Sequence, residues 1–468
     1  MNIAIVDDRA EAAAVVRGAR AGIFAANAYS VDPADCLVYG YDNSRRQAAA
    51  DAVVFPTSHA QVAALVAVCR RLAMPIVARG RGTNTTGATV PVAGGVVVSF
   101  VRMNRILEID PANRLAVVEP GVLNGALQAA LAPHGFFWPP DPTSSPYCTI
   151  GGNLACNSAG PRAVKYGAPR ENTLGLRAVA GTGEEFRCGY RTTKGATGYD
   201  LTRLLIGAEG TLALITEATL KLTPLPGAKR LLRATYTTIQ SAASAVSRIM
   251  AQPVTPCALE FLDDEALRLA RGHGGEAIPV AGAMLLIEAD GEADTLPAAV
   301  EAISRAARGD GLIELRAAND AAETEALWAA RKALSPALRS IAPMKINEDV
   351  VVPVSRVPEL IDGLKTISVQ FGIPIVNFGH AGNGNIHVNL LYRPEDPAQA
   401  AAAPGCLAAV FDLVLALGGT LSGEHGIGLV KREFLPRALD PVTLALMRRI
   451  KAQFDPDGLL NPGKLLPD

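Results

Sequence analysis

The chain has 468 residues and a formal net charge of −1, with 44 Lys and Arg against 45 Asp and Glu. This balance argues against nucleic acid or an anionic membrane as the main partner, and a chain of this length is expected to fold into two or more domains. Hydrophobic residues make up 49% and charged residues 19%, which is typical of a well-packed soluble enzyme.

The N-terminal stretch 1–18 has two early aspartates and no basic segment, so its pattern is not that of a signal peptide. The absence of a run of 18 or more apolar residues predicts that no segment spans a membrane. The seven cysteines form no Cys-x-x-Cys pair, which argues against an iron–sulfur cluster or a structural zinc site. Scattered thiols of this kind favour a cytoplasmic protein.

Between about residues 50 and 225, short β-rich runs alternate with helical runs. Residues 61–73, "QVAALVAVCRRLA", have helical spacing, and a strand follows at 75–80, with further strands at 95–100 and 115–121. This half is therefore α/β or α+β with many turns. Prolines cluster in "LKLTPLPGAKR", and we place a domain boundary there.

A duplicated strand–helix–strand unit follows the boundary. The first copy comprises strands at 231–237 and 257–263 around a helix, and the second comprises strands at 283–290 and 312–318 around another. Such repeats favour an antiparallel sheet with helices on one face. A helix is expected at about 320–341, and the strands in "EDVVVPV" and "NIHVN" would extend the same sheet. The turn-rich tail 454–467 is expected to dock on another domain.

Three of the six histidines lie in two glycine-flanked clusters, "GHAGNGNIHVN" (379–389) and "SGEHGIG" (422–428). Strand alternation puts His387 and Asn389 on one face, and the glycine-rich turn can bring His380 back beside them. Two neutral imidazoles suit Zn, Mn or Fe, and a third ligand would complete an open catalytic site. Glu424 and His425 offer one ligand and one base. The alternative is a pair of core histidines satisfied by hydrogen bonds.

The segment "PIVARGRGTNTTGA" (75–88) follows a strand and carries a glycine-rich loop whose backbone N–H groups can cradle phosphate. The next segment is β-like and contains a proline, whereas a dinucleotide-binding fingerprint needs a helix there, so we exclude an NAD site of that kind. An ordinary tight turn remains the alternative. Two further glycine-bearing segments, 141–167 and 206–216, strengthen the case for a ligand.

Taken together, these motifs resemble the FAD-binding D-2-hydroxyacid dehydrogenases, which include D-lactate dehydrogenase, D-2-hydroxyglutarate dehydrogenase and the glycolate oxidase catalytic subunit. The resemblance runs from "DAVVFPTSHAQVAALV" to "NPGKLLP". It implies an α+β protein with three parts. A two-lobed PCMH-type FAD-binding domain would span 1–226, and a ferredoxin-like antiparallel α+β cap domain with the substrate and metal sites would span 227–425. Residues 426–468 would return to the FAD domain.

The resemblance also assigns site residues. It implies that Zn or Mn is held by His380, His387 and Glu424, and that His425 is the catalytic base. The expected substrate contacts are Arg331, Ser335, Lys345 and Asn389. The expected FAD-binding residues are Arg79, Gly80, Arg81, Gly82, Thr83, Asn84, Thr85, Gly87, Ala88, Pro142, Thr143, Ser144, Gly151, Gly152, Asn153, Asn157, Ser158, Gly160, Glu209, Gly210, Ile215 and Asn461.

Two residues depart from the family pattern. Relatives that bind flavin covalently often carry His just after the arginine–glycine loop, and Thr83 stands there, so we expect non-covalent FAD. Asn383 stands where family members often have Asp, which would change the surroundings of the metal.

The implied reaction is metal-assisted oxidation of a D-2-hydroxy acid to the 2-oxo acid. D-2-hydroxyglutarate is favoured if all the carboxylate-binding candidates face the pocket, with D-lactate or glycolate as alternatives. The implied electron acceptor is a quinone, an electron-transfer flavoprotein or a cytochrome, through which the protein could associate peripherally with a membrane. A homodimer is compatible with these patterns. Two rival classes are a metal hydrolase, which would be colourless, and a non-catalytic flavin-binding subunit.

Overall fold

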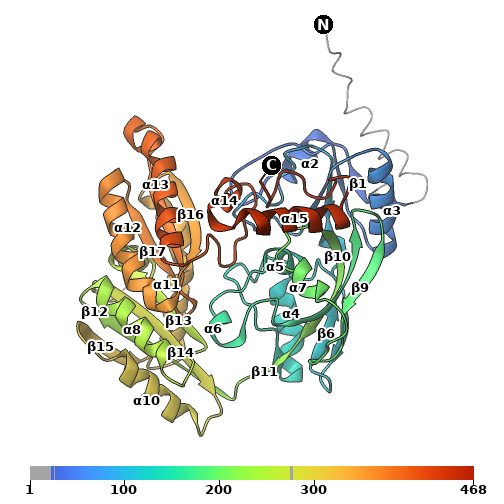
Figure 1. Ribbon diagram of the computed structural model, residues 1–468. Coiled ribbons are helices and arrows are strands. Elements are labelled where there is room, and N and C mark those ends of the chain that lie inside the picture. The colour runs from blue at the N-terminus through green and yellow to red at the C-terminus, as the bar shows by residue number, and fades with distance from the viewer. Residues whose placement is uncertain (1–22, 26, 275–277, 468) are drawn as a thin grey trace. The chain divides into compact units, whose positions relative to one another are not determined.

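The computed structural model describes residues 23–25, 27–274 and 278–467 (Figure 1). The N-terminal stretch tested for a signal-peptide pattern lies outside these residues. The chain forms two compact units. The first comprises the described residues up to Ala159, then Ala168–Leu225 and the chain from Glu424, and the second comprises Gly160–Gly167 and Pro226–Gly423. The units change at 225/226 and 423/424, beside the expected boundaries, but the insertion of 160–167 into the second unit was not anticipated.

The first unit begins with a four-stranded sheet in the order β1–β2–β4–β3. Its strands β2, β4 and β3 are parallel, largely buried and rich in valine, as expected for strands covered on both faces. The loop after β3 leads into β4 rather than a helix, as the β-like pattern of the following segment predicted. The elements are β1 (Tyr29–Ser30), α2 (Pro33–Val38), β2 (Ala52–Val54), α3 (His59–Arg71), β3 (Ile76–Arg79), β4 (Val96–Ser99) and η1 (Phe100–Arg102).

A five-stranded antiparallel sheet in the order β5–β6–β10–β8–β9 forms the second lobe of the first unit. Ala213, Ala218 and Leu220 of β10 are buried in one core with residues of α4, α5 and the C-terminal helix α15. The elements are β5 (Ile106–Asp110), β6 (Leu115–Val118), α4 (Asn124–Leu131), η2 (Ala132–His134), β7 (Phe136–Phe137), α5 (Ile150–Cys156), β8 (Thr173–Ala180), β9 (Glu185–Gly189), α7 (Leu201–Leu205), β10 (Ala213–Lys221), β11 (Thr223–Pro224), η7 (Arg432–Phe434), α14 (Leu435–Ala438) and α15 (Pro441–Phe454).

The second unit is built on a seven-stranded antiparallel sheet in the order β15–β12–β14–β13–β17–β18–β16. Both predicted strand–helix–strand copies are present, and the two later strands extend the same sheet, as expected. The strands are β12 (Ala228–Tyr236), β13 (Ala258–Asp263), β14 (Ala283–Gly291), β15 (Leu312–Ala317), β16 (Met344–Val351), β17 (Ile375–His380) and β18 (Asn385–Tyr392). The mixed α/β composition and the antiparallel sheets confirm the expected fold class.

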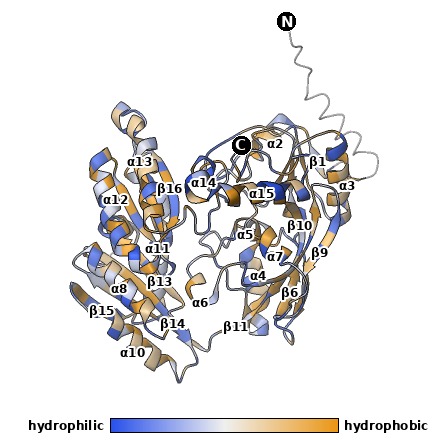
Figure 2. Cartoon of the chain, in the orientation of Figure 1, coloured by the Kyte–Doolittle hydropathy of each residue, from blue (hydrophilic) through white to orange (hydrophobic). Residues whose placement is uncertain are grey.

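Helices cover both faces of this sheet, so the expectation of one covered face was too simple. On one face α9 (Asp264–Gly274) and α11 (Ala321–Ala337) pack in a core with Leu262, Met284 and Leu286. A second set, α8 (Ile239–Ala251), α10 (Leu296–Ala307), α12 (Val357–Phe371) and α13 (Pro397–Ala416), forms another layer by contacts between successive helices. Figure 2 colours α8 and α12 in both blue and orange, as expected for amphipathic helices.

The helix α13 meets the length and composition threshold for a membrane span, with a mean hydropathy of 1.6, although the sequence reading expected no such segment. One third of that window, 33%, is buried within the protein. Its buried residues include Ala403, Cys406, Val410 and Val414, and the helix contacts α12, β16 and β18. These buried residues recur every three or four positions, which is the spacing expected of a helix that packs one face against a sheet.

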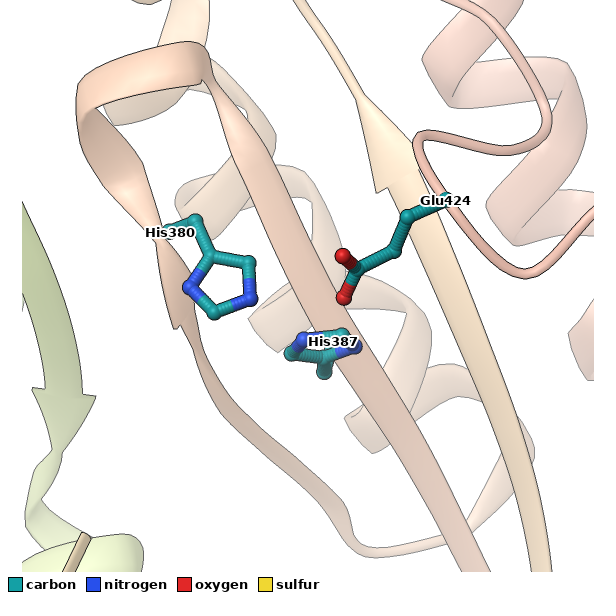
Figure 3. A group of neighbouring side chains, drawn as sticks. All are labelled: His380, His387 and Glu424. Atoms are coloured by element: carbon teal, nitrogen blue, oxygen red, sulfur yellow. The ribbon is translucent and has the colours of Figure 1, made fainter. Parts of the chain in front are cut away.

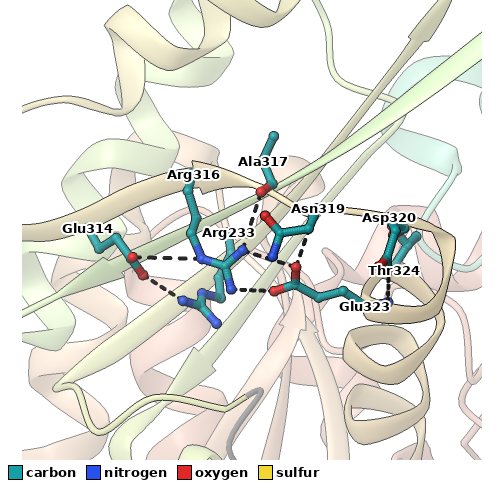
Figure 4. A network of polar contacts seen from close by, with 8 residues as sticks. All are labelled: Arg233, Glu314, Arg316, Ala317, Asn319, Asp320, Glu323 and Thr324. Carbon is teal, nitrogen blue, oxygen red and sulfur yellow. Dashed lines mark hydrogen bonds and ion pairs between the residues drawn. The ribbon is translucent and has the colours of Figure 1, made fainter.

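The N-terminus of α11 is fixed to the edge strand β15 by ion pairs (Figure 4). Arg316 on β15 pairs with Glu323 on the first turn of α11, and Arg233 on β12 pairs with Glu314 at 2.6 Å. Asp320 caps the helix by accepting a hydrogen bond from the backbone N–H of Glu323 at 2.8 Å. This network anchors the helix that carries Arg331 and Ser335.

The short segment 160–167, with helix α6 (Ala163–Tyr166), belongs to the second unit through contacts with β13, β14 and the turn after β17. Lys165 forms an ion pair with Asp290, and the Tyr166 hydroxyl donates to the same carboxylate at 2.7 Å. Val164 packs so closely on Gly382 that a Cβ there would lie 2.6 Å from a Val164 methyl group. The remaining 3-10 turns of this unit are η4 (Leu338–Ser340), η5 (Val354–Arg356) and η6 (Ala381–Asn383).

Candidate functional site

Two of the predicted metal ligands lie on neighbouring strands. The antiparallel register pairs Phe378 with His387 and His380 with Asn385, so the two histidines lie on one face of the sheet, close together. Their ring centroids are 5.2 Å apart in an edge-on arrangement. The connecting turn needs Gly384, which has φ +70° and whose added Cβ would lie 1.9 Å from the Val352 carbonyl oxygen. The glycine-rich turn therefore brings both imidazoles together as expected.

The third predicted ligand, Glu424, follows Gly423, the last residue of the second unit. The carboxylate of Asp349 on β16 fixes this approach, because it accepts from the Gly423 N–H at 2.9 Å and from the Ser422 hydroxyl at 3.0 Å. Glu424 is the next residue in the chain, so the anchoring of Gly423 to the sheet also fixes where the Glu424 side chain begins.

The side chains of His380, His387 and Glu424 point toward one another (Figure 3). One potential ligand atom from each lies within 4.8 Å of the others, and all three residues are buried. Two imidazoles and one carboxylate are a donor set that suits Zn or Mn and leaves an open coordination position. The residues present therefore fit a divalent metal.

A buried carboxylate, Glu260 on β13, lies behind this group. Its Oε1 contacts His380 Nδ1 at 2.5 Å, and its Oε2 contacts Arg331 Nε at 2.8 Å and Nη2 at 2.7 Å. Burial alone would raise the pKa of Glu260, but the charges of His380 and Arg331 outweigh it and lower that pKa to about 2. The sequence reasoning missed Glu260, although a carboxylate within the apolar strand "CALEFLD" was a visible signal.

The residues predicted to contact the substrate interact with other protein groups in three separate places. Arg331 is 6% exposed, pairs with Glu260 and stacks 4.8 Å from the Phe378 ring centroid. Lys345 Nζ donates to the Ser335 hydroxyl at 2.9 Å. Asn389 is fully buried, and its amide group donates to the carbonyl oxygens of Val376 and His387, both at 3.0 Å.

In the first unit, the predicted FAD loop 79–88 is a compact, glycine-dependent structure. Gly82 and Gly87 have φ values of +67° and +80°, and a Cβ on Gly80 would lie 2.3 Å from Thr149 Oγ1. Asn84 Oδ1 accepts from the Thr86 N–H at 2.8 Å and from the Ala88 N–H at 3.2 Å, which curls the loop. A chain this close to its neighbours has space only for glycine at these points.

The same loop fits a bound cofactor. Thr85 Oγ1 is buried and has no hydrogen-bond partner among the described residues, as expected for a group that faces a ligand. Immediately before Thr85 in the sequence, Asn84 Nδ2 donates to the backbone carbonyl oxygen of His425 at 3.0 Å. The loop residues therefore fit the FAD expected there.

The segment 141–160 places its predicted FAD residues around the start and the end of α5. Thr149 caps the helix, and Gly151 and Gly152 form its first turn, where a Cβ on Gly151 would lie 2.6 Å from Pro120. Asn157 ends the helix in the left-handed region with φ +53°, and the Ser158 hydroxyl donates to the Glu424 carbonyl oxygen at 3.0 Å. The turn 142–145, with Pro142, Thr143 and Ser144, precedes this helix. Asn153 is buried within it, and Gly160 lies just beyond the unit boundary.

Glu209 joins the third glycine segment to the chain after His425. Its carboxylate accepts from the Ile427 N–H at 2.6 Å and from the Gly428 N–H at 2.8 Å. Burial raises the pKa of Glu209 to about 7, against the two N–H donors and the charges of Lys431 and Lys464. Glu209 and Gly210 both have positive φ, and Ile215 follows on β10.

Asn461 closes this assembly from the tail. Its amide donates to the carbonyl oxygens of Ala88 at 2.9 Å and Glu209 at 2.7 Å. The structure thus joins four segments that are distant in sequence: 79–88, 206–216, 425–428 and 461–464.

A cavity of about 700 Å³ lies beside the first loop, within the usual size range of ligand pockets. Five of its lining residues were predicted to bind FAD, namely Arg79, Arg81, Gly82, Thr83 and Ser144. The rest come from the segment 41–47 and from Tyr147. Sequence reasoning missed the segment 41–47, because nothing in its composition connects it to the loop. Arg79 Nη1 makes that connection by donating to the Tyr41 carbonyl oxygen at 2.6 Å.

Two family descriptions match the chain. Residues 50–189 match "FAD binding domain", and residues 225–465 match "FAD linked oxidases, C-terminal domain". Among curated proteins, the chain is 39% identical over 431 residues to the glycolate oxidase subunit GlcD of Bacillus subtilis (strain 168), covering 92% of each chain. It is 34% identical to the D-lactate dehydrogenase of Anaerostipes hadrus, covering 89% of each.

Solved structures share the fold at lower identity. p-Cresol methylhydroxylase aligns with a TM-score of 0.80 at 15% identity, covering 98% of this chain and 97% of that one. Alkyldihydroxyacetonephosphate synthase aligns with a TM-score of 0.73 at 24% identity, covering 97% of this chain and 86% of that one. These likenesses show that the chain shares the fold of these proteins.

Proposed function

The chain belongs to the FAD-linked oxidases and is an FAD-linked oxidoreductase, and we propose that it oxidises a small D-2-hydroxy acid to the 2-oxo acid with the help of a divalent metal. Its relatives support the substrate class, because they include proteins named glycolate oxidase subunit and D-lactate dehydrogenase. The clustered His380, His387 and Glu424 support the metal. A flavin-free hydrolase would leave the cofactor-binding half of the chain without a role.

FAD would be held non-covalently by the loop 79–88, the first turn of α5 and the segment around Glu209. When bound, FAD would supply the redox chemistry by taking up the two electrons and the hydrogen removed from substrate C2, and an external acceptor would then reoxidise it. Around it, the chain itself provides backbone N–H groups at glycine positions, the buried Thr85 hydroxyl and the cap of Asn461. Thr83 at the position of a covalent link favours dissociable FAD.

The metal would be held by His380, His387 and Glu424, where it would chelate the substrate and lower the pKa of the hydroxyl group. His425 is proposed as the base that accepts the hydroxyl proton, because histidine is the side chain that most often serves as a general base. The Asn84 amide and the Glu209 carboxylate hold the backbone that follows the His425 side chain, at the His425 carbonyl oxygen and at the Ile427 N–H. A base fixed in this way needs little reorganisation to accept a proton.

We propose a monocarboxylate such as D-lactate or glycolate as the substrate in preference to D-2-hydroxyglutarate. The sequence reading favoured the dicarboxylate if Arg331, Ser335 and Lys345 all bound its carboxylates. In the structure, Arg331 is buried and its charge is balanced by Glu260, while Lys345 donates to Ser335. A buried ion pair attracts a second carboxylate far less than an isolated cation does.

The buried His/His/Glu group beside a sheet of an FAD-linked oxidase carries this proposal. Anaerobic mixing of purified protein with glycolate, D-lactate, L-lactate, D-malate and D-2-hydroxyglutarate, followed through the flavin absorbance, tests it. Bleaching by a D-2-hydroxy acid that stops after metal removal by a chelator and returns with Zn²⁺ or Mn²⁺ is expected. Full bleaching by metal-depleted protein would contradict the metal role, and no bleaching by any 2-hydroxy acid would contradict the substrate class.

A further inference from the structure

We propose that Glu260 is a positioning residue that holds His380 in the orientation and tautomer needed to bind the metal through Nε2, an inference that rests on the metal site proposed above. Glu260 contacts none of the proposed reacting groups. It acts through the His380 ring.

Strand register places Glu260 for this role. In the pairing of β13 with β17, Phe261 lies opposite Gly379 and Leu262 opposite Phe378. Antiparallel partners step in opposite directions, so Glu260 comes opposite His380 on the same face of the sheet. The result is the contact of 2.5 Å between Oε1 and His380 Nδ1. The contact is therefore built into the sheet rather than made by a flexible loop.

The chemistry of the contact fixes the tautomer. A carboxylate can only accept a hydrogen bond, so His380 Nδ1 must carry the proton. A histidine that donates from one ring nitrogen presents the other as the metal ligand, and the carboxylate raises its basicity. His380 Nε2 is then the ligand atom available to join His387 and Glu424.

Arg331 holds Glu260 in turn. Its Nε and Nη2 both contact Oε2, the oxygen not used by His380, and its guanidinium group stacks on Phe378. Glu260 and Arg331 are 1% and 6% exposed, so water does not compete for these contacts. The three side chains form a series of contacts from α11 through β13 to β17. Because Arg331 holds Oε2, the Glu260 carboxylate cannot rotate, and Oε1 stays directed at the His380 ring.

The alternative is that Glu260 only fastens α11 to the sheet. The chain offers a matched control for this alternative, because Glu323 fastens the same helix through Arg316 and contacts neither histidine. A variant that loosens α11 without touching His380 is therefore Glu323→Gln. Glu260→Gln keeps the shape of the side chain and a hydrogen-bond acceptor but removes the charge.

The test is a competition titration of Zn²⁺ between a chelator and the flavin-loaded wild type, Glu260→Gln and Glu323→Gln, with flavin content measured in each. Glu260→Gln is expected to bind Zn²⁺ about 10- to 100-fold more weakly with unchanged flavin content. Glu323→Gln is expected to match the wild type within a factor of about two, because it lies outside the contacts around the metal. Equal affinity in Glu260→Gln and wild type, or an equal loss in both variants, would overturn the inference.

A second measurement covers the case in which Glu260→Gln does not fold. In wild-type protein with ¹⁵N-labelled histidine and Zn²⁺, the ring signals of His380, assigned by their absence in His380→Asn, should show Nδ1 protonated and Nε2 bound to metal. Metal binding through Nδ1 would overturn the inference while leaving the proposed metal site intact. A wild type that binds neither Zn²⁺ nor Mn²⁺ would instead contradict the proposed metal-assisted function itself.

Discussion

The guanidinium group of Arg331 and the carboxylate of Glu260 form a buried ion pair in which both Nε and Nη2 lie within 2.8 Å of the same oxygen. Arg331 brings a positive charge to the neighbourhood of the proposed metal ligands, and the carboxylate of Glu260 neutralises that charge. Under the function proposed above, the pair would link substrate choice to metal binding, because Glu260 also contacts His380.

Substrate preference should change when this pair is broken. We expect wild-type kcat/KM to be higher for D-lactate or glycolate than for D-2-hydroxyglutarate. Glu260→Gln, assayed at saturating metal, should raise the ratio of D-2-hydroxyglutarate to D-lactate about 10-fold, since a hydrogen bond to a charged group contributes about 1.5–3 kcal/mol. The double variant Glu260→Gln/Arg331→Met should lose this gain. A wild type that already prefers D-2-hydroxyglutarate would refute the argument.

Replacing His425 should separate proton transfer from cofactor binding. His425→Ala should slow reductive bleaching of the flavin about 10²- to 10⁴-fold, which is the usual contribution of a general base. Flavin content should stay normal, because the loop contacts at residue 425 are made by its backbone oxygen. His134→Ala, at an exposed histidine of the same unit, is the control. Undiminished bleaching in His425→Ala would remove the role of His425 as the base.

Asn461 should be essential to the closure of the FAD site. Asn461→Ala leaves the buried carbonyl oxygens of Ala88 and Glu209 without their donor and places alanine at φ +46°. Urea unfolding should show a loss of about 2–6 kcal/mol, at about 1–3 kcal/mol for each of the two stranded oxygens, together with weaker FAD retention. The nearby exposed substitution Asp457→Asn should change neither quantity by much. A loss below about 0.5 kcal/mol would show that these bonds do not close the site.

Glu209 predicts a pH dependence of stability. Burial raises its pKa from 4.5 to about 7, so the folded protein binds this proton more tightly than the unfolded chain does. Stability from this group is present at low pH and is lost as the pH rises from about 4.5 to about 7, by a free energy on the order of 3 kcal/mol. Glu209→Gln should remove that slope, measured by urea unfolding of both proteins in the same flavin state. A wild type and a variant with parallel profiles would contradict the shifted pKa.

The elements of the fold were largely predictable, because they depend on local spacing. The period of 3.6 over residues 61–73 and the two strand–helix–strand copies after residue 227 correspond to α3, β12–α8–β13 and β14–α10–β15. The alternation in "NIHVNL" correctly put His387 and Asn389 on one face of β18. The family membership was also predictable, because the glycine loops and histidine clusters occur together and in order.

The surroundings of the site were less predictable, because they depend on register between distant strands. Glu260 lies 120 residues before His380, and only the pairing of β13 with β17 makes it a neighbour. The pairing of Arg331 with Glu260 is equally invisible in "WAARKALS", where the arginine looks available for a substrate. The segment 160–167 joins the second unit through contacts with residues far away in sequence, such as the ion pair between Lys165 and Asp290. No local pattern encodes such contacts.

The hydrogen bonds from Asn461 to Ala88 and Glu209 also determine when the cofactor site can form during protein synthesis. Ala88 is synthesised 373 residues before Asn461, so during most of translation the loop lacks the side chain that hydrogen-bonds to it. The complete cofactor site can therefore form only near the end of synthesis. A chain truncated before residue 461 would lack the hydrogen bonds from Asn461 to Ala88 and Glu209 and would be exposed to cellular quality control.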